Sequence, residues 1–470
     1  MATQQKQGRW GERRSRAALA VVALLGIGSF GLVTGGMDTL NRAAADPTTP
    51  GSDRSDEWPI TECGTSNGRG CAPTGKRVDL ERPTFSNPTA ITNPLFPVSE
   101  LRSVIQVGQV DGKPFRSETT TLPTLGAVDW YGTKVPVVLS QYVAYLDGTI
   151  TEVALDRYAQ ADDGSVWYFG EDVIDYVNGS AAFIEGTWLA GRDGPPAMIM
   201  AAKPTLGDVF RVENVIGIVF EELTVVKVDQ TVRGPNGPVP GAIVVDELGV
   251  AGGHSMKTLA PGYGEFLTAD GRDLEAMAVA TPTDAQAGGA PLEIRKALTA
   301  AWGTLEYVRA EDWPTARRSV ARIARQVAVL DQTQQPQRVM ALLHSSLTSL
   351  QRAVGARSVG AAELACVEVA QSAIDLEARY LPPDQIEVAR FHLHTQQLRV
   401  AAAAGSYAKV TGEVAALERI RDRLAVEGDQ ARTVDLALVA MRTASDSRNL
   451  PAAADHATRV ASLVRNLSVR

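Results

Sequence analysis

The sequence predicts a multidomain chain: an N-terminal transmembrane helix, an antiparallel all-β domain built as a sandwich or partial barrel, and an all-α helical bundle. Three observations support this order. A run of 21 uncharged residues occupies positions 17–37, short β-rich runs fill the middle of the chain, and a helical period of apolar residues fills its last third. The charge follows the same division, because residues 76–290 carry 15 basic and 28 acidic groups, whereas residues 291–470 carry 23 and 19.

These observations divide the chain into six segments. They are a cytoplasmic basic tail (1–16), a transmembrane helix or signal anchor (17–37), a flexible Pro/Gly/Ser-rich stalk (38–90), the all-β domain (91–283), a linker (284–290) and the all-α helical bundle (291–470).

The first 37 residues predict where the protein is located. Five basic residues and a single acid, Glu12, precede the apolar run, and positive charge marks the cytoplasmic side of a membrane span. A run of about 20 apolar residues is long enough to cross a bilayer. We therefore expect a single-pass protein of the cell membrane, with a cytoplasmic N-terminus and its bulk outside. The small-residue site Ala43-Ala44-Ala45 leaves an alternative open, in which the chain is cleaved near Ala45 and secreted.

The segment 38–90 is rich in Pro, Gly, Ser, Thr and Asp and has no periodicity, which predicts a flexible stalk. Cys63 and Cys71 lie in this segment, eight positions apart. In an oxidising compartment they are placed to close a small disulfide loop. Cys366 lies in an apolar helical pattern, so we expect it to be a buried thiol.

Residues 91–283 predict the all-β domain. Runs such as 135–145, 166–169 and 215–228 are β-rich, and no long amphipathic helix interrupts them. The turn dipeptides between such runs are Asp147-Gly148, Asp163-Gly164, Asn178-Gly179, Asp193-Gly194, Asn236-Gly237 and Asp270-Gly271. Strands bounded by these dipeptides at short spacing indicate antiparallel hairpins, about six to ten strands in all.

Beyond the linker at 284–290, the chain is rich in Ala, Leu, Arg, Glu and Gln, and apolar residues recur at three and four positions. Breaks at Gly and Pro predict about seven or eight helices joined by short turns. Similar helix corners surround Trp313, Tyr407 and Leu450, which lie 94 and 43 residues apart. Because a repeat array needs a fixed period, this spacing favours a bundle of similar hairpins.

The sequence contains no catalytic signature, and we expect a non-enzymatic protein without a cofactor. His344, His392 and His394 lie on predicted helices, and helical bundles hold metal ions between facing helices. His392 and His394 are two positions apart and therefore point in different directions. Metal binding by these histidines is one alternative, and partly exposed or core histidines are the simpler interpretation.

Aromatic and acidic residues concentrate between positions 158 and 188. The candidate ligand-binding residues are Tyr158, Trp167, Tyr168, Phe169, Glu171, Asp172, Glu185 and Trp188. Core packing is the simplest explanation of aromatic residues on one strand face. The alternative is an apolar patch with an acidic rim, the usual build of a ligand or partner site. Paired carboxylates such as Glu171 and Glu185 also suit acid–base chemistry on a sugar polymer.

Two segments of the β domain carry a resemblance to a known family. Residues 158–172 read YAQADDGSVWYFGED, and residues 185–194 read EGTWLAGRDG. Together with 93–97, 207–211 and 260–264, they resemble the hallmark motifs of an uncharacterised family of secreted bacterial β-domains. The resemblance covers about residues 93–270 and implies an exported, β-rich domain. It implies no activity and no catalytic residue, and it does not extend to residues 291–470.

Taken together, the observations favour a membrane-anchored, extracytoplasmic binding or interaction protein of the bacterial cell envelope. Its expected partners are the membrane, through the N-terminal helix, and an envelope protein or a small-molecule ligand. Nucleic acid is not an expected partner, because the net charge of −8 leaves no basic footprint. The two alternatives are an envelope metal-binding protein that uses the bundle histidines, and an envelope polymer hydrolase that uses the paired carboxylates.

Overall fold

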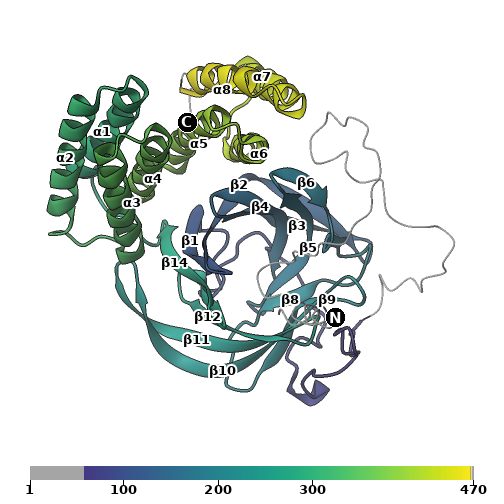
Figure 1. Ribbon diagram of the computed structural model, residues 1–470. Helices are drawn as coiled ribbons and strands as arrows, with labels where there is room; N and C mark the ends of the chain where they lie inside the picture. Colours follow the sequence, from purple (N-terminus) through teal and green to yellow (C-terminus); the bar gives the residue numbers. More distant parts are fainter. Residues whose placement is uncertain (1–57, 466, 468–470) are drawn as a thin grey trace, which may run out of the picture.

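The computed structural model describes residues 58–465 and residue 467, and in this part a large antiparallel β-sheet is followed by eight helices (Figure 1). The predicted order of a β domain and a helical region is confirmed here. The basic tail, the predicted span at 17–37 and the cleavage site near Ala45 lie outside the described residues. Within the described ranges, none of the helices combines the length and the apolar character that crossing a membrane requires.

The strands of the β domain run from residue 103 to residue 281. They are β1 (Ser103–Val110), β2 (Lys113–Trp130), β3 (Thr133–Leu146), β4 (Thr149–Gln160), β5 (Val166–Val177), β6 (Ser180–Phe183), β7 (Trp188–Leu189), β8 (Ala197–Met200), β9 (Val209–Val215), β10 (Val219–Gly234), β11 (Gly237–Gly249), β12 (His254–Ala260), β13 (Gly264–Asp270) and β14 (Asp273–Thr281).

All of these strands belong to one antiparallel sheet. Twelve of them follow the order β6-β5-β4-β3-β2-β1-β14-β13-β12-β11-β10-β9, and β7 and β8 both pair with β5 outside this order. Most neighbours are consecutive in the chain, as hairpins require, and the pairing of β1 with β14 joins the first strand to the last. The sheet curls round on itself (Figure 1). At its two ends, β8 pairs with β5 and lies beside β9. The domain is therefore a partial barrel and not a two-sheet sandwich.

Residues 58–90 pack against this barrel, so the prediction of a flexible stalk is wrong for the described part of that segment. Ile60 is buried, and Cys63 and Cys71 form a disulfide. The composition of the segment was a poor guide, because its few large apolar residues, among them Trp58 and Phe85, pack against the core of the barrel and specific polar contacts hold the rest.

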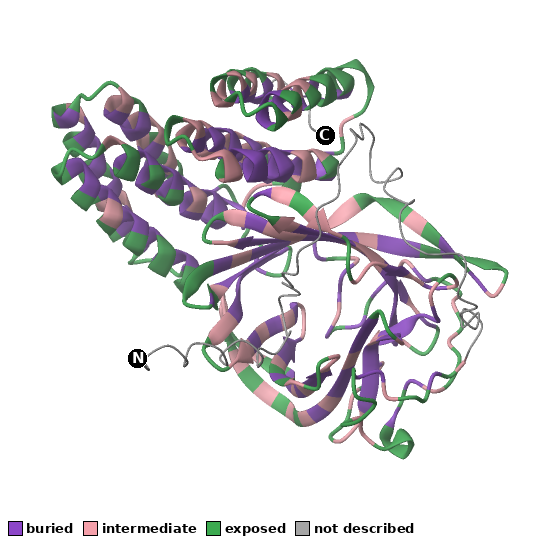
Figure 2. Cartoon of the chain, turned by 45° about the vertical axis from the view of Figure 1, so that its right-hand side comes forward, coloured by how far each residue is buried: buried purple, intermediate pink, exposed green. Residues whose placement is uncertain are grey.

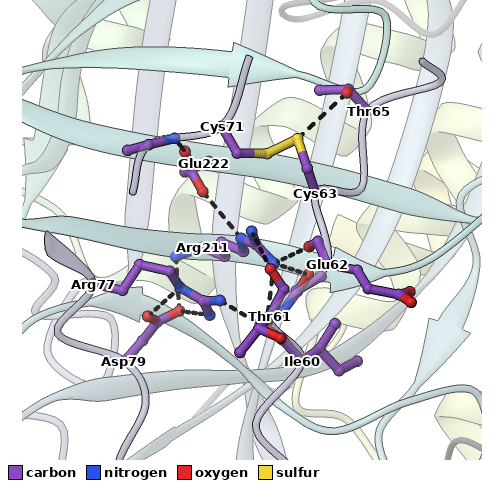
Figure 3. Close-up of polar contacts among 12 residues, drawn as sticks. Ile60, Thr61, Glu62, Cys63, Thr65, Cys71, Arg77, Asp79, Arg211 and Glu222 are labelled. Atoms are coloured by element: carbon purple, nitrogen blue, oxygen red, sulfur yellow. Dashed lines mark hydrogen bonds and ion pairs between the residues drawn. A yellow bond between two sulfur atoms is a disulfide. The ribbon is translucent and has the colours of Figure 1, made fainter. Parts of the chain in front are cut away.

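Two buried arginines make these contacts (Figure 3). Arg211 on β9 donates to the carbonyl oxygens of Ile60 and Glu62, at 3.3 and 2.6 Å, and to the Glu222 carboxylate on β10 at 3.1 Å. Arg77 donates to the same carbonyl of Ile60 at 2.6 Å. Backbone carbonyls that would otherwise lose water are thereby satisfied, and the segment is fixed to two strands of the barrel.

The helical region consists of α1 (Leu292–Arg309), α2 (Trp313–Leu330), α3 (Gln337–Gly355), α4 (Val359–Glu377), α5 (Pro383–Ala403), α6 (Tyr407–Arg423), α7 (Gly428–Asp446) and α8 (Leu450–Arg465). Each of two four-helix units has the same arrangement. In the first unit each helix contacts the next and α1 contacts α4, and in the second unit α5 contacts α8 in the same way. The units are joined where α4 contacts α5.

The same turn recurs in all four hairpins of the helical region. Its residue with positive φ, between 53° and 69°, is in turn Glu311, Arg357, Gly405 and Arg448. The next residue donates its backbone N–H to the carbonyl five residues earlier, and is in turn Asp312, Ser358, Ser406 and Asn449. This pattern is the Schellman type of helix ending.

The second helix of each hairpin begins at Trp313, Val359, Tyr407 or Leu450, after intervals of 46, 48 and 43 residues. The corner at Val359 lies between Trp313 and Tyr407 and divides their 94-residue spacing in two. The helical region is therefore a row of four similar hairpins, with a period that the bundle prediction did not include.

The helices cover the outer face of part of the barrel. Ile105 of β1 and Val279 of β14 belong to one apolar cluster with residues of α1 to α5. Val143 of β3 packs in another cluster with Ala415 and Ala416 of α6. Figure 2 shows the helices with buried residues along one side and exposed residues along the other.

Charged side chains also lie buried in this interface. We call them the interface ion network: Arg116, Glu118, Asp375, Glu387, Arg390 and Arg423. Glu118 of β2 lies 2.8 Å from Arg116 and 2.9 Å from Arg423 of α6, and Arg116 lies 2.8 Å from Asp375 of α4. With three arginines and three carboxylates, the network is balanced in charge.

Candidate ligand-binding cavity

The interior of the barrel contains a cavity of about 390 Å³. Because side chains alternate between the two faces of a strand, every second residue of a strand points inward. On β4 these residues are Glu152, Ala154, Asp156 and Tyr158, all of which line the cavity. The volume lies within the range of pockets that hold small molecules.

Carboxyl groups dominate the lining. They are Glu152, Asp156, Glu171, Asp175, Glu185, Glu213, Glu221, Glu265 and Glu275. Lys257 is the one basic residue among the described residues that line the cavity. Glu185 is exposed, and Glu265 keeps 38% of its side chain accessible, so these two lie where the cavity meets solvent.

On one side of the cavity, Lys257 of β12 compensates its acidic neighbours. Its Nζ lies 2.7 Å from Glu247 and 3.7 Å from Glu265. Burial alone would lower the pKa of Lys257, but these carboxylates hold it well above its usual value. Burial would likewise raise the pKa of Glu247, but the Lys257 ammonium keeps it below the usual range. This side is an ordinary buried ion pair.

On the other side, none of the carboxyls forms an ion pair with a cation in the described part of the chain, and Lys257 acts only at a distance, on Glu213. We call the five carboxyls of this side, on β4, β5 and β9, the acidic wall: Glu152, Asp156, Glu171, Asp175 and Glu213. Burial, followed by the neighbouring carboxyls Asp175 and Asp156, raises the pKa of Glu152 to about 8. Burial and the nearby Glu185 raise the pKa of Asp175 to about 6. Like charges in a poorly solvated space favour the protonated form of each group.

Three of these carboxyls interact with a tyrosine or with each other. Burial raises the pKa of Asp156 to about 6, although the Tyr168 hydroxyl donates to it at 2.6 Å and opposes that rise. Glu171 of β5 lies near Glu213 of β9, and burial together with Glu213 raises the pKa of Glu171 well above its usual value. Two neighbouring carboxyls of this kind titrate as a pair.

Ser140 of β3 provides an unused polar group in the same cavity. Its side chain is fully buried and lines the cavity. Its Oγ has no hydrogen-bond partner among the residues described by the structure. Since buried hydroxyls are normally hydrogen-bonded, this group is suited to bond a molecule inside the cavity.

The structure divides the predicted ligand-binding residues into three groups. Tyr158, Glu171 and Glu185 line the cavity. The aromatic residues Trp167, Tyr168, Phe169 and Trp188 are instead buried in the apolar core of the barrel, so the interpretation of these four as a ligand patch is wrong. Asp172 points away from the cavity and pairs with Arg157 at 2.5 Å.

The three candidate metal-binding histidines have different surroundings. His344 bonds Asp331 at 2.8 Å on the surface, and buried His394 bonds Glu413 at 2.8 Å. The His392 ring lies 5.1 Å from the ring of Trp302, and burial lowers the pKa of His392 to about 4. In the described part of the chain, no three His, Cys, Asp or Glu side chains form a group suited to a metal ion.

The prediction from sequence missed most of the cavity residues, although a signal for them exists. Glu152 and Asp156 are four positions apart, and each lies two positions before an apolar or aromatic residue, Ala154 or Tyr158, on a strand whose other residues are largely apolar. Carboxyls at this spacing share one strand face. Only closure of the sheet decides that this face is the enclosed one.

Comparisons with known proteins give no identification. The chain matches no family model, no curated protein and no solved structure.

Proposed function

We propose that the protein is a binding protein of the bacterial cell envelope that holds a small molecule inside its β-barrel. The observation that carries this proposal is the cavity of about 390 Å³ lined by polar groups that the chain leaves uncompensated. Binding sites combine a preformed concave space with a few polar groups of this kind. The motifs that resemble secreted β-domains agree with it.

The location outside the cytoplasm is part of the proposal. The disulfide between Cys63 and Cys71 supports it, because such bonds persist in oxidising compartments. We further propose that residues 17–37 anchor the chain in the membrane. Whole cells treated with a membrane-impermeant reductant and then a membrane-impermeant maleimide are expected to label Cys63 and Cys71. Labelling only after lysis would contradict the proposed topology.

A ligand screen tests the binding function directly. We expect at least one member of a panel of amines, amino acids, sugars and nucleosides to raise the melting temperature of the full chain purified in mild detergent. Ala154 is buried and lines the cavity, so Ala154→Leu fills part of the space and should abolish the shift. Ala181→Leu, on the exposed edge of β6, is the matched control and should retain it. A shift that survives in Ala154→Leu would place the ligand elsewhere.

One observation favours a second candidate, the hydrolase. The neighbouring carboxyls Glu171 and Glu213 resemble carboxyl pairs in which one group is a base and the other an acid. In this alternative the ionised carboxyl takes a proton from water and the protonated one gives a proton to the leaving group. It predicts turnover of an envelope polymer that Glu171→Gln abolishes and Asp172→Asn leaves unchanged. Binding without turnover would exclude it.

A further inference from the structure

The charges of the cavity indicate what kind of molecule it takes. Within the described ranges, no Lys, Arg or His nitrogen forms an ion pair with any carboxyl of the acidic wall. The strongest electrostatic neighbours of Glu152 are four other carboxyls, Asp175, Asp156, Glu275 and Glu213. Asp156 and Asp175 are buried and the other three carboxyls of the wall are half-buried. Like-charged carboxyls held together without an ion-pair partner cost free energy, and a bound cation reduces that cost.

A second feature of the cavity points to a ligand independently of charge. The Ser140 Oγ is fully buried, faces the cavity from β3 and has no partner among the residues that the structure describes. A hydroxyl oxygen accepts from an N–H donor. The carboxyls and this hydroxyl together form a wall that accepts hydrogen bonds from several sides.

The rest of the cavity lining suits the aliphatic chain of a ligand. Phe96, Leu101 and Val173 contribute apolar surface to the same cavity. The ring of Tyr158 packs edge-to-face at 4.9 Å against that of Phe96 and adds aromatic surface to the same lining. Methylene groups of a ligand pack favourably against such apolar and aromatic side chains.

We propose that the cavity binds a linear aliphatic polyamine, whose ammonium groups pair with the acidic wall and with Ser140 and whose methylene groups pack against Phe96, Leu101 and Val173. This inference rests on the proposed binding function and names its ligand class. Several charges are needed because the carboxyls come from three separate strands. A single metal ion would need three or more ligands to converge, and the described residues contain no such group.

Calorimetric titration of the full chain with spermidine at pH 7.5 tests the inference. We expect saturable binding of one spermidine per chain, with n-butylamine at least tenfold weaker because it neutralises one carboxyl only. Glu171→Gln should weaken the binding of spermidine at least tenfold. Asp172→Asn is the matched control, because Asp172 is the next residue on β5 but pairs outward with Arg157, and its affinity should be unchanged. Ser140→Ala, the smallest change available, should weaken binding several-fold and serves if Glu171→Gln does not fold.

The possible outcomes separate this inference from the proposed function. One outcome is that spermidine does not bind, while a neutral or anionic compound binds and Ala154→Leu abolishes that binding. In that case the assignment of a polyamine as ligand is wrong, and the proposed binding of a small molecule in the cavity holds. If Mg²⁺ or Ca²⁺ binds with the same dependence on Glu171, the cavity is a metal site and the inference is overturned. If nothing in the panel binds, both proposals fail.

Discussion

The two faces of the barrel bury charge in opposite ways. On the outer face, the interface ion network combines three arginines with three carboxylates. On the inner face, nine carboxyls share the cavity with Lys257. The two sets come from different strands. The network uses Arg116 and Glu118 of β2, whereas the cavity carboxyls come from β4, β5, β9, β10, β13, β14 and the segment between β6 and β7.

The charges that surround each set of carboxyls decide whether these carboxyls are ionised or protonated. Burial would raise the pKa of Glu118, but Arg390, Arg116 and Arg423 hold it well below its usual value. Glu152 lies half-buried among other carboxyls instead, and desolvation and these neighbours raise its pKa to about 8. A buried charge that the chain itself neutralises is structural, whereas one that it leaves to protons or to a ligand is the better candidate for function.

The largest effect on the free energy of unfolding is expected when the interface ion network loses a cation. Arg423→Ala leaves Glu118 and Glu387 buried without one of their partners, and breaking a buried pair costs about 3–5 kcal/mol. Urea unfolding followed by circular dichroism measures the loss. Arg432→Ala is the control, because the Arg432 side chain is 76% exposed and lies 3.9 Å from its partner; such pairs contribute about 0–1 kcal/mol. Equal effects of the two substitutions would refute the structural role of the network.

A smaller loss of stability is expected where the barrel and α6 approach closely without an ion pair. Gly179, in the turn between β5 and β6, has a φ of +77°, and a Cβ there would lie 2.0 Å from the carbonyl oxygen of Ala408 in α6. Gly179→Ala should therefore cost about 1–3 kcal/mol beyond its backbone strain. Gly148→Ala is the matched control, since Gly148 has a φ of +68° with nothing within 4 Å. A difference below about 0.5 kcal/mol between the two would mean that α6 yields easily at this point.

Part of this architecture could be predicted from the sequence. The turn dipeptides marked hairpins because Asn-Gly and Asp-Gly adopt the positive φ that tight turns need, and Asn178 and Gly179 do so here. The helix break at Gly355 was also predicted, but the corner that follows it was not grouped with the other three, because its second helix begins at Val359 and not at an aromatic residue or Leu. Its residue with positive φ is Arg357, at 53°, a residue that seldom adopts this conformation.

The cavity could not be predicted because it depends on contacts between strands that are far apart in the chain. Glu171 and Glu213 meet only when β8 brings β5 beside β9. Trp167 and Trp188 drew attention as a ligand patch, yet they are 2% and 0% exposed. Their size, which suggested binding, is what fills the barrel wall.

The smallest effect is expected on the pH dependence of stability, which should differ between the inner and the outer face of the barrel. Because the folded-state pKa of Glu152, about 8, lies above its ordinary 4.5, the native protein holds more protons than the unfolded chain between these values. Stability without ligand should therefore fall as pH rises through this range. Glu118 has the opposite shift, and its contribution is lost only in acid.

Glu152→Gln keeps the shape of the protonated acid and cannot ionise. We expect it to flatten the decline in melting temperature between pH 6 and pH 8 and to raise that temperature by about 2–4 °C at pH 8, or about 1 kcal/mol. Glu100→Gln, at an exposed position, is the control and should leave the pH profile of the wild-type chain unchanged. Because a bound polyamine neutralises the same wall, saturating spermidine should flatten the wild-type profile as Glu152→Gln does. Parallel profiles of wild type and Glu152→Gln would show that the acidic wall is solvated well enough to ionise freely, and would remove the physical reason for a cationic ligand.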